Sequence, residues 1–235
     1  MQKIAIIIPC YNEEKRLSEA ALHELHNTTP VHIYLCNDGS TDGTAALIDG
    51  FANRMERCFA IQYSKNQGKA NTIYKSANAL LAKNDYTHIG YFDADFSTPV
   101  GEIKRMLQHL AEEPSRFLIG SRVKLLNNDI QRKTHRHFIG RAIITIINFK
   151  LNLGIYDTQC GAKLFPAGIA TEGFSQPFKT SWLFDIELFI RLKKKGLLSR
   201  GEEFPLRHWK DVDGSKLGWK TSFKILKELL ILQKL

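Results

Sequence analysis

The amino-terminal half of the chain alternates short apolar runs with longer segments of helical periodicity, and no other feature constrains the fold as strongly. Candidate strands cover Ile4–Ile8, Val31–Cys36, Cys58–Tyr63, His88–Phe92 and Phe117–Gly120. Candidate helices between them cover Glu13–His26, Asp42–Met55, Lys69–Ala82 and Val100–Ala111. Strands that alternate with helices are typical of a parallel sheet covered on both faces. We therefore expect an α/β fold with a mostly parallel central sheet.

The carboxy-terminal half is less regular. We expect a helical pattern at Arg132–Leu151, a glycine-containing segment at Asp157–Phe165, a helix at Trp182–Lys195 and a strand at Glu203–Leu206. A chain of 235 residues with 43% apolar residues fits one domain, because single cores grow to about 250–300 residues. We expect that domain to span 1–215 and a basic amphipathic helix to span 216–235. Periodicity leaves open whether this helix packs on the protein's own core or on a membrane surface.

Charge and hydropathy narrow the classes of function. The chain lacks the ~18-residue apolar run of a membrane span, so we do not expect an integral membrane protein. The residues before Pro9 read as a buried strand and not as a signal peptide, and four scattered cysteines favour the cytoplasm. The net charge of +9 predicts an anionic partner, and residues 121–150 alone carry +6 of it. No nucleic-acid recognition motif accompanies this charge, so we expect phosphate groups or a membrane surface instead.

Polar and acidic residues follow the predicted strands, where ligands bind in sheets of this type. Asp93 and Asp95 come directly after the fourth strand, and two carboxylates at this spacing suit Mg²⁺ or Mn²⁺. The alternative is that Asp95 only caps the turn before Ser97. After the second strand, Asp38 can accept hydrogen bonds from a base or a ribose, although turns and helix caps have the same composition.

Four motifs follow one another in the first half of the chain: Ile6–Glu14 (IIIPCYNEE), Asn37–Thr44 (NDGSTDGT), Gly68–Ala70 (GKA) and Asp93–Asp95 (DAD). In this order and at this spacing they resemble the inverting glycosyltransferases of family 2. Four later motifs resemble the polyprenyl-phosphate branch, and the dolichyl-phosphate glucosyltransferases in particular: Gly120–Arg122, Asp157–Phe165, Phe184–Leu188 and Asp213–Leu217. The likeness covers nearly the whole chain.

The resemblance implies a GT-A fold that binds a nucleotide-diphosphate sugar, with UDP-glucose favoured and a mannose donor next. It implies donor contacts from Pro9, Tyr11, Asn12, Glu13, Asp38, Lys69, Asp93, Ala94, Asp95, Ser215 and Lys216. Asp93 and Asp95 would hold Mg²⁺ or Mn²⁺ on the diphosphate, which gains negative charge as the glycosidic bond breaks. Phe96 and Ser97 stand where mannosyl relatives often offer a glutamine, so the third ligand stays open, with Ser97 and water as the candidates.

The same resemblance implies a polyprenyl phosphate, dolichyl or undecaprenyl, as the acceptor. Arg122 and Arg136 match positions that bind the acceptor phosphate, a task that suits the bidentate guanidinium. Asp185 would act as a base or support the acceptor, or else it only favours the dipole of its helix. We expect a peripheral protein at the cytoplasmic face of a membrane. It would reach the lipid either by binding the membrane surface or through a membrane-embedded partner. The alternatives are transfer to a soluble saccharide or protein hydroxyl, and a catalytically silent member of the family.

Overall fold

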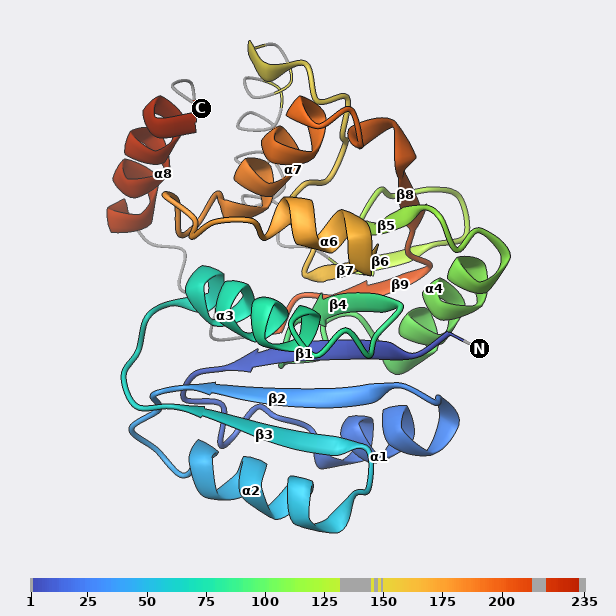
Figure 1. Cartoon of the computed structure of the whole chain (residues 1–235), viewed down its shortest axis with the longest axis vertical. Coiled ribbons are helices and arrows are strands. Elements are labelled where there is room, and N and C mark those ends of the chain that lie inside the picture. The colour runs from blue at the N-terminus through green and yellow to red at the C-terminus, as the bar shows by residue number, and fades with distance from the viewer. Residues whose placement is uncertain (1, 132–144, 146–147, 149, 213–218, 233–235) are drawn as a thin grey trace.

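The computed structural model describes residues 2–131, 145, 148, 150–212 and 219–232 (Figure 1). Its main sheet contains β1 (Ile4–Cys10), β2 (His32–Asp38), β3 (Cys58–Tyr63), β4 (His88–Phe92), β5 (Phe117–Ser121), β7 (Ala162–Pro166) and β8 (Gly201–Pro205). The strand order is β3-β2-β1-β4-β7-β5-β8. Within it β7 alone runs antiparallel to its neighbours, β4 and β5. The predicted, mostly parallel sheet is therefore confirmed.

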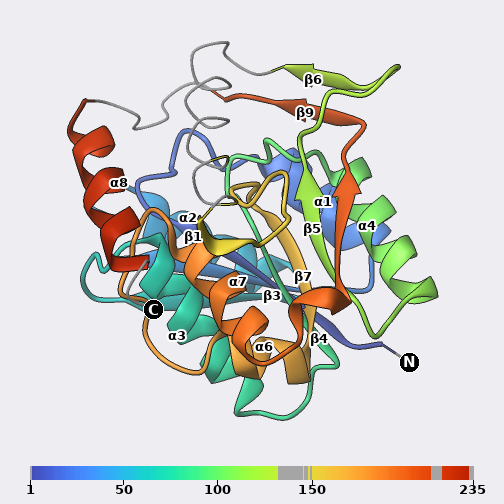
Figure 2. The same ribbon diagram turned by 90° about the horizontal axis from the view of Figure 1, so that it is seen from above.

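Helices cover both faces of this sheet. They are α1 (Glu19–Thr28), α2 (Thr44–Arg54), α3 (Lys69–Leu81), α4 (Val100–Glu112), α6 (Ala167–Gly173), α7 (Phe184–Lys194) and α8 (Trp219–Leu232), with a 3₁₀ turn at Leu198–Arg200. One apolar core joins the sheet to α3, α6, α7 and α8, and a second joins it to α1, α2 and α4. A separate two-stranded sheet of β6 (Asp129–Gln131) and β9 (His208–Lys210) stands apart from the main sheet (Figure 2).

The first helix begins later than its sequence pattern predicts. We expect a helix from Glu13, but residues 13–17 form a turn in which the amides of Arg16 and Leu17 donate to the Glu13 carbonyl. Helix α1 begins only at Glu19, because the Ser18 side chain caps it by accepting from the amide of Ala21 at 3.2 Å. The acidic residues before Ser18 thus belong to the loop after β1.

The second half contains one strand that the pattern missed. The segment Asp157–Phe165 is predicted without a strand, yet β7 starts at Ala162 and pairs with β4 from Phe92 back to His88. The predicted helix at Trp182–Lys195 begins at Phe184, and the predicted strand at Glu203–Leu206 is β8. Most of the predicted helix at Arg132–Leu151 lies outside the described residues.

The C-terminal helix α8 packs on the protein itself. Ile225 and Leu232 are buried in the same core as α7, whereas Leu230 is 57% exposed. Glu228 is buried as well, and its carboxylate accepts from the amides of residues 181–183 and from the Ser181 hydroxyl at 2.8–3.0 Å. This face of α8 therefore docks on the core. No helix among the described residues is long and apolar enough to cross a membrane.

The chain before α7 is held by a second buried carboxylate, Glu187. Its oxygens accept from the amides of Lys179 and Thr180 and from the Thr180 hydroxyl at 2.9–3.2 Å, and Arg191 pairs with it at 2.7 Å. Together with Glu228, it accepts the backbone N–H groups of five consecutive residues, Lys179–Leu183. The position of α7 is thereby tied to that of α8.

Candidate active site

The candidate site lies at the carboxyl edge of the sheet, between β1 and β4. The chain leaves β1 toward β2 and β3 on one side, whereas β4 lies on the other side. Ligands of open α/β sheets bind between loops that diverge at such a point, and we call this region, between the loops after β1 and β4, the carboxylate crevice. The loop after β1 brings Tyr11, Asn12 and Glu13 to this crevice, and the loop after β4 brings Asp93–Asp95. Pro9 is the penultimate residue of β1.

Asp93 meets a lysine from the start of α3. The ammonium of Lys69 forms an ion pair with Asp93, and both side chains remain more than a third exposed. Removal from bulk water lowers the pKa of Lys69, but the carboxylates of Asp93, Asp185 and Asp95 outweigh this effect and raise it. Lys69 therefore stays charged and faces a cluster of carboxylates, of which Asp93 is the most exposed and Asp185 is buried.

Asp95 is bound through both of its oxygens. Oδ1 accepts from the Ser97 amide at 3.0 Å and from the Ser97 hydroxyl at 2.7 Å, which forms an Asx turn. Oδ2 accepts from the Arg16 guanidinium at 2.9 Å. Between them Phe96 has a φ of 49°, a value that side chains of this size rarely adopt. The turn after β4 thus holds a strained backbone next to the two carboxylates, as functional sites often do.

The loops after β1 and β2 are joined by side-chain hydrogen bonds. The Asn12 amide donates to the Ser40 hydroxyl at 3.0 Å, and the Asn12 side chain accepts from the Thr41 amide at 2.9 Å. The Glu13 amide donates to the Thr44 hydroxyl at 2.8 Å. These contacts give the two predicted donor-binding motifs one common frame.

Asp38 is buried at the end of β2 and shapes the loop after β3. Its two oxygens accept from the amides of Gln67 and Gly68 at 2.9 and 2.8 Å. The next residue, Gly39, has a φ of 64°, and a Cβ there would lie 2.5 Å from the backbone of Lys65. The carboxylate that we expect to contact the nucleotide is therefore also the anchor that places Lys69 after Gly68.

Asp185 lies in the first turn of α7 and is only 5% exposed. Lys163 of β7, which is fully buried, pairs with it at 2.8 Å, and the Tyr91 hydroxyl donates to the same oxygen. Burial and the Asp185 carboxylate raise the pKa of Tyr91, so the phenol keeps its proton. In this structure Asp185 is a buried, paired carboxylate beneath the site and not a free base.

Arg122 follows β5 and is held by Asp157. Two guanidinium nitrogens donate to the two oxygens of Asp157 at 2.7 Å each, and the Arg122 amide donates at 3.0 Å. The guanidinium also lies 5.1 Å from the centre of the Trp209 ring. Burial opposes its charge, but Asp157 raises the pKa of Arg122 above its ordinary value. The other predicted acceptor residue, Arg136, and the predicted donor residues Ser215 and Lys216 lie outside the described residues.

Three residues that the structure brings to the site, Arg16, Gly161 and Lys163, were not among the site residues predicted from the sequence. Arg16 sits in a charged stretch that reads as the surface of a helix, and Lys163 interrupts an apolar run. Gly161 leaves room for the Asp93 side chain, because a Cβ at this position would lie 1.9 Å from Asp93 Oδ2. Its carbonyl accepts from the Asp93 amide at 3.0 Å. The glycine within the motif Asp157–Phe165 was the available signal for a close contact. The need for a glycine there becomes clear only when β7 pairs with β4.

The two aspartate carboxylates at this edge fit a magnesium or manganese ion. Asp93 and Asp95 offer the hard carboxylate oxygens that these ions prefer. Among the described residues no group of three or more His, Cys, Asp or Glu side chains could hold a metal. An ion bound by this pair would therefore take its remaining ligands from substrate phosphates and water, as Mg²⁺ commonly does. When bound, it would neutralise charge on a leaving diphosphate.

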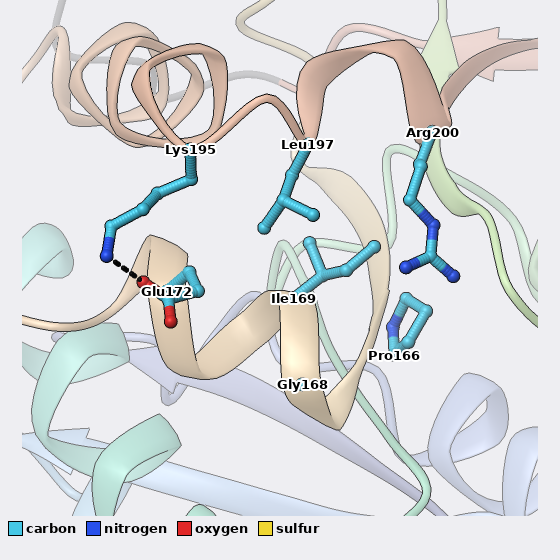
Figure 3. Close-up of a pocket in the computed structure, with 7 residues that line it drawn as sticks. All are labelled: Pro166, Gly168, Ile169, Glu172, Lys195, Leu197 and Arg200. Atoms are coloured by element: carbon cyan, nitrogen blue, oxygen red, sulfur yellow. Dashed lines mark ion pairs between the residues drawn. The ribbon is translucent and has the colours of Figure 1, made fainter.

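A pocket of about 510 Å³ lies elsewhere, beside Ile169 and Leu197 (Figure 3). Its lining includes Pro166, which pairs with His88 at the start of β4, so the pocket is at the opposite edge of the sheet. The lysine there, Lys195, points to Glu172 and pairs with it at 2.9 Å. The pocket shares no residue with the carboxylate crevice, and the chemistry described above lies in the crevice.

Comparison with known proteins agrees with this fold and site. Residues 5–174 match the family model described as glycosyl transferase family 2. A dolichyl-phosphate beta-glucosyltransferase of Trichomonas vaginalis is 30% identical, over 97% of this chain and 72% of the relative. The dolichyl-phosphate beta-glucosyltransferases of Saccharomyces cerevisiae and Homo sapiens are each 28% identical, over 98% and 92% of this chain and 74% and 70% of their own lengths.

Solved structures of GT-A glycosyltransferases share the fold. Glucosyl-3-phosphoglycerate synthase from Mycobacterium tuberculosis, in complex with Mn²⁺, UDP-glucose and phosphoglyceric acid, superposes with a TM-score of 0.68 at 14% identity, over all of this chain and 80% of that one. Mannosyl-3-phosphoglycerate synthase from Rubrobacter xylanophilus gives 0.68 at 16% identity, over all of this chain and 76% of that one. The expected GT-A fold is thus confirmed, and the chain belongs to glycosyl transferase family 2.

Proposed function

We propose that this glycosyltransferase moves glucose from UDP-glucose to dolichyl phosphate or a related polyprenyl phosphate, with inversion at the anomeric carbon. The observation that carries the proposal is the match to dolichyl-phosphate beta-glucosyltransferases from three organisms over 92–98% of the chain. The carboxylate crevice supplies the chemistry that such a donor needs. A structural neighbour solved with Mn²⁺ and UDP-glucose supports the same donor class.

In this proposal the loops after β1 and β2 hold the nucleotide. Pro9, Tyr11, Asn12, Glu13 and Asp38 contact the base and ribose, with Ala94 beside them. Asp93 and Asp95 hold Mg²⁺ or Mn²⁺ on the diphosphate. The charged Lys69 pairs with Asp93 and also feels the charge of Asp95. Ser215 and Lys216 complete the donor site. Metal and lysine together stabilise the charge that develops on the leaving nucleoside diphosphate.

The acceptor phosphate binds to Arg122 and Arg136. A phosphate monoester is ionised near neutral pH, so its oxygen attacks without a strong general base. The pairing of Asp185 with Lys163 supports this assignment, because the carboxylate is already engaged by an ammonium group. Asp185 then supports the floor of the site. Guanidinium groups match the geometry of phosphate oxygens, and Arg122 would use the N–H groups that Asp157 does not take.

The lipid acceptor requires contact with a membrane, and we place the enzyme at the cytoplasmic face. Residues 1–215 form the catalytic domain, and the basic amphipathic helix within 216–235 completes it. The burial of Ile225 and Glu228 supports this close association. The basic residues of segment 121–150 supply the charge that attracts an anionic surface.

The test is nucleotide release from a panel of UDP- and GDP-hexoses, with Mn²⁺ or Mg²⁺, in the presence and absence of a short polyprenyl phosphate. We expect release from UDP-glucose that needs both metal and lipid phosphate. Release that is stimulated by a soluble saccharide or peptide, and is indifferent to lipid phosphate, would contradict the acceptor. Release from GDP-mannose alone would contradict the donor.

A further inference from the structure

Each carboxylate of the Asp93–Asp95 pair already has its own protein cation. Lys69 forms an ion pair with Asp93, and Arg16 forms one with Asp95 at 2.9 Å. Glu13 adds a third carboxylate, 3.4 Å from Arg16 Nε, so both cations are already engaged by carboxylates before any ligand arrives. Lys69 has a role in the donor site proposed above, whereas Arg16 has none so far.

Arg16 lies across the crevice. Its backbone belongs to the turn after β1, since its amide donates to the Glu13 carbonyl at 2.9 Å. Its side chain reaches the loop after β4, where Nη2 contacts Asp95. The guanidinium therefore spans the two sides of the point at which the sheet reverses its strand order, and this is where the donor binds in our proposal.

The hydrogen-bonding capacity of Arg16 is incompletely used. Its Nε is buried but donates no hydrogen bond within the described part of the chain, and it lies 3.4 Å from Glu13 Oε2. The side chain as a whole is 29% exposed, so the guanidinium is in reach of a ligand. Nε faces the Glu13 carboxylate in an ion pair, so it is the exposed part of the Arg16 side chain that a ligand can reach.

This arrangement of charges makes a divalent ion and a diphosphate depend on each other. An ion that binds Asp93 and Asp95 alone deprives Lys69 of its partner and leaves Arg16 only the longer 3.4 Å contact with Glu13, and the added positive charge opposes binding. A diphosphate brings the negative charge that the two displaced cations need. A guanidinium is suited to such an exchange, because its planar fork binds carboxylate and phosphate oxygens equally well.

From this geometry we infer that Arg16 is a further donor-site residue, which holds Asp95 in the free enzyme and passes to the donor diphosphate when the metal binds. Arg16 and Lys69 act together, so that the metal and the nucleotide bind tightly only in each other's presence. The inference rests on the proposed function, because it takes the donor to be a nucleoside diphosphate sugar.

The experiment measures Mn²⁺ binding directly, by electron paramagnetic resonance of the free ion, with and without UDP. For the wild-type protein we expect UDP to tighten Mn²⁺ binding by about 5- to 150-fold, the usual range of coupling between two sites. UDP affinity must rise by the same factor when Mn²⁺ is added, since coupling is reciprocal. Neither readout depends on turnover.

The variant Arg16→Met separates a donor-site role from a structural one. Without the competing cation, Mn²⁺ alone should bind about 2- to 5-fold more tightly, the equivalent of one partly exposed ion pair. UDP should bind more weakly in the presence of Mn²⁺, and the coupling factor should shrink. Arg16→Lys should restore part of the coupling. The matched control is Arg54→Met, which removes a surface arginine that pairs with Glu19, and it should change neither affinity.

If the salt bridge only fastens the loop, the Mn²⁺ affinity of Arg16→Met should stay the same or fall. If Mn²⁺ binds the Arg16→Met protein no more tightly than wild type, with coupling to UDP unchanged, the inference is wrong while the proposed function stands. If the folded wild-type protein binds neither Mn²⁺ nor UDP, the proposed function fails and takes the inference with it.

Discussion

Two pairs of carboxylates in this protein have opposite environments. Glu187 and Glu228 are 1% and 5% exposed, and their partners are mostly the backbone amides of one segment, Lys179–Leu183. Asp93 and Asp95 are more open, with side chains 37% and 17% exposed, and their charged partners are the side chains of Lys69 and Arg16. Backbone amides cannot leave without unfolding the segment, whereas long cationic side chains can turn to another anion. The first pair is built to hold the chain, and the second is built to exchange partners.

The largest expected effect comes from the open pair. Asp95→Ala or Asp93→Ala should lower turnover by about 1,000-fold or more, because a lost metal ligand removes several kcal/mol of charge stabilisation. Stability should change little, since both side chains are partly exposed. Steady-state kinetics and thermal melting check the two expectations. Full metal-dependent activity in a folded variant would show that the metal binds elsewhere.

The closed pair should behave in the reverse way. Glu228→Ala leaves the amides of residues 181–183 without their acceptor, and that of Leu183 is buried. A buried group without a partner costs about 1–3 kcal/mol, so we expect the free energy of unfolding to fall by about that amount. The matched control is Glu112→Ala, an exposed glutamate of α4 that should stay within about 0.5 kcal/mol of wild type. Denaturant titration measures both, and equal stability of the two variants would refute the role of Glu228 as a clamp.

A glycine substitution tests the geometry of the open pair without removing any charge. In Gly161→Ala the new Cβ would lie 1.9 Å from Asp93 Oδ2, so the Asp93 side chain must move. A displacement of this size at a reacting centre costs about 100-fold in rate. Gly101→Ala, in α4, meets nothing within 4 Å and should keep wild-type kinetics. Unchanged kinetics in Gly161→Ala would mean that Asp93 does not need this position.

The smallest expected effect, that of Tyr91→Phe, tests whether Asp185 is a structural carboxylate like Glu187 and Glu228 or takes part in the reaction like Asp93 and Asp95. Tyr91→Phe removes one hydrogen bond to a buried charge, which is worth about 1.5–3 kcal/mol of stability. If Asp185 is a structural carboxylate, turnover of the remaining folded enzyme should change little. A loss of turnover comparable to that of Asp95→Ala, at unchanged Mn²⁺ affinity, would instead place Asp185 in the reaction.

Sequence patterns predicted the place of the open pair in the fold, because that place depends on local features. A mostly apolar strand such as His88–Phe92 marks a central position in the sheet, and the residue that follows it lies at the edge where ligands bind in such sheets. The same reasoning placed Asp38 and Lys69 at this edge, and their contact with a donor stays a prediction. Arg16 was missed because the turn at Glu13 replaces the first part of a predicted helix, and that turn points the side chain inward.

The rest of the site depends on contacts between distant segments. Strand β7 was missed because Lys163 breaks its apolar pattern, and the burial of that lysine makes sense only once Asp185 of α7 lies beside it. Glu228 reads as one acidic residue on a basic helix, and nothing near it in the sequence shows that it accepts the amides of residues 181–183. Long-range pairing of charge with backbone leaves no periodic signal.

The most direct test of the proposed function is the product itself. Purified protein is incubated with UDP-glucose, Mn²⁺ and a short polyprenyl phosphate, and the lipid fraction is examined by mass spectrometry and NMR. We predict a glucosyl phosphate lipid with a β linkage, formed from an α-linked donor, and no such product with Asp95→Ala. Glucose recovered only as free sugar or on a soluble hydroxyl would contradict a lipid phosphate acceptor, and an α-linked lipid product would contradict inversion.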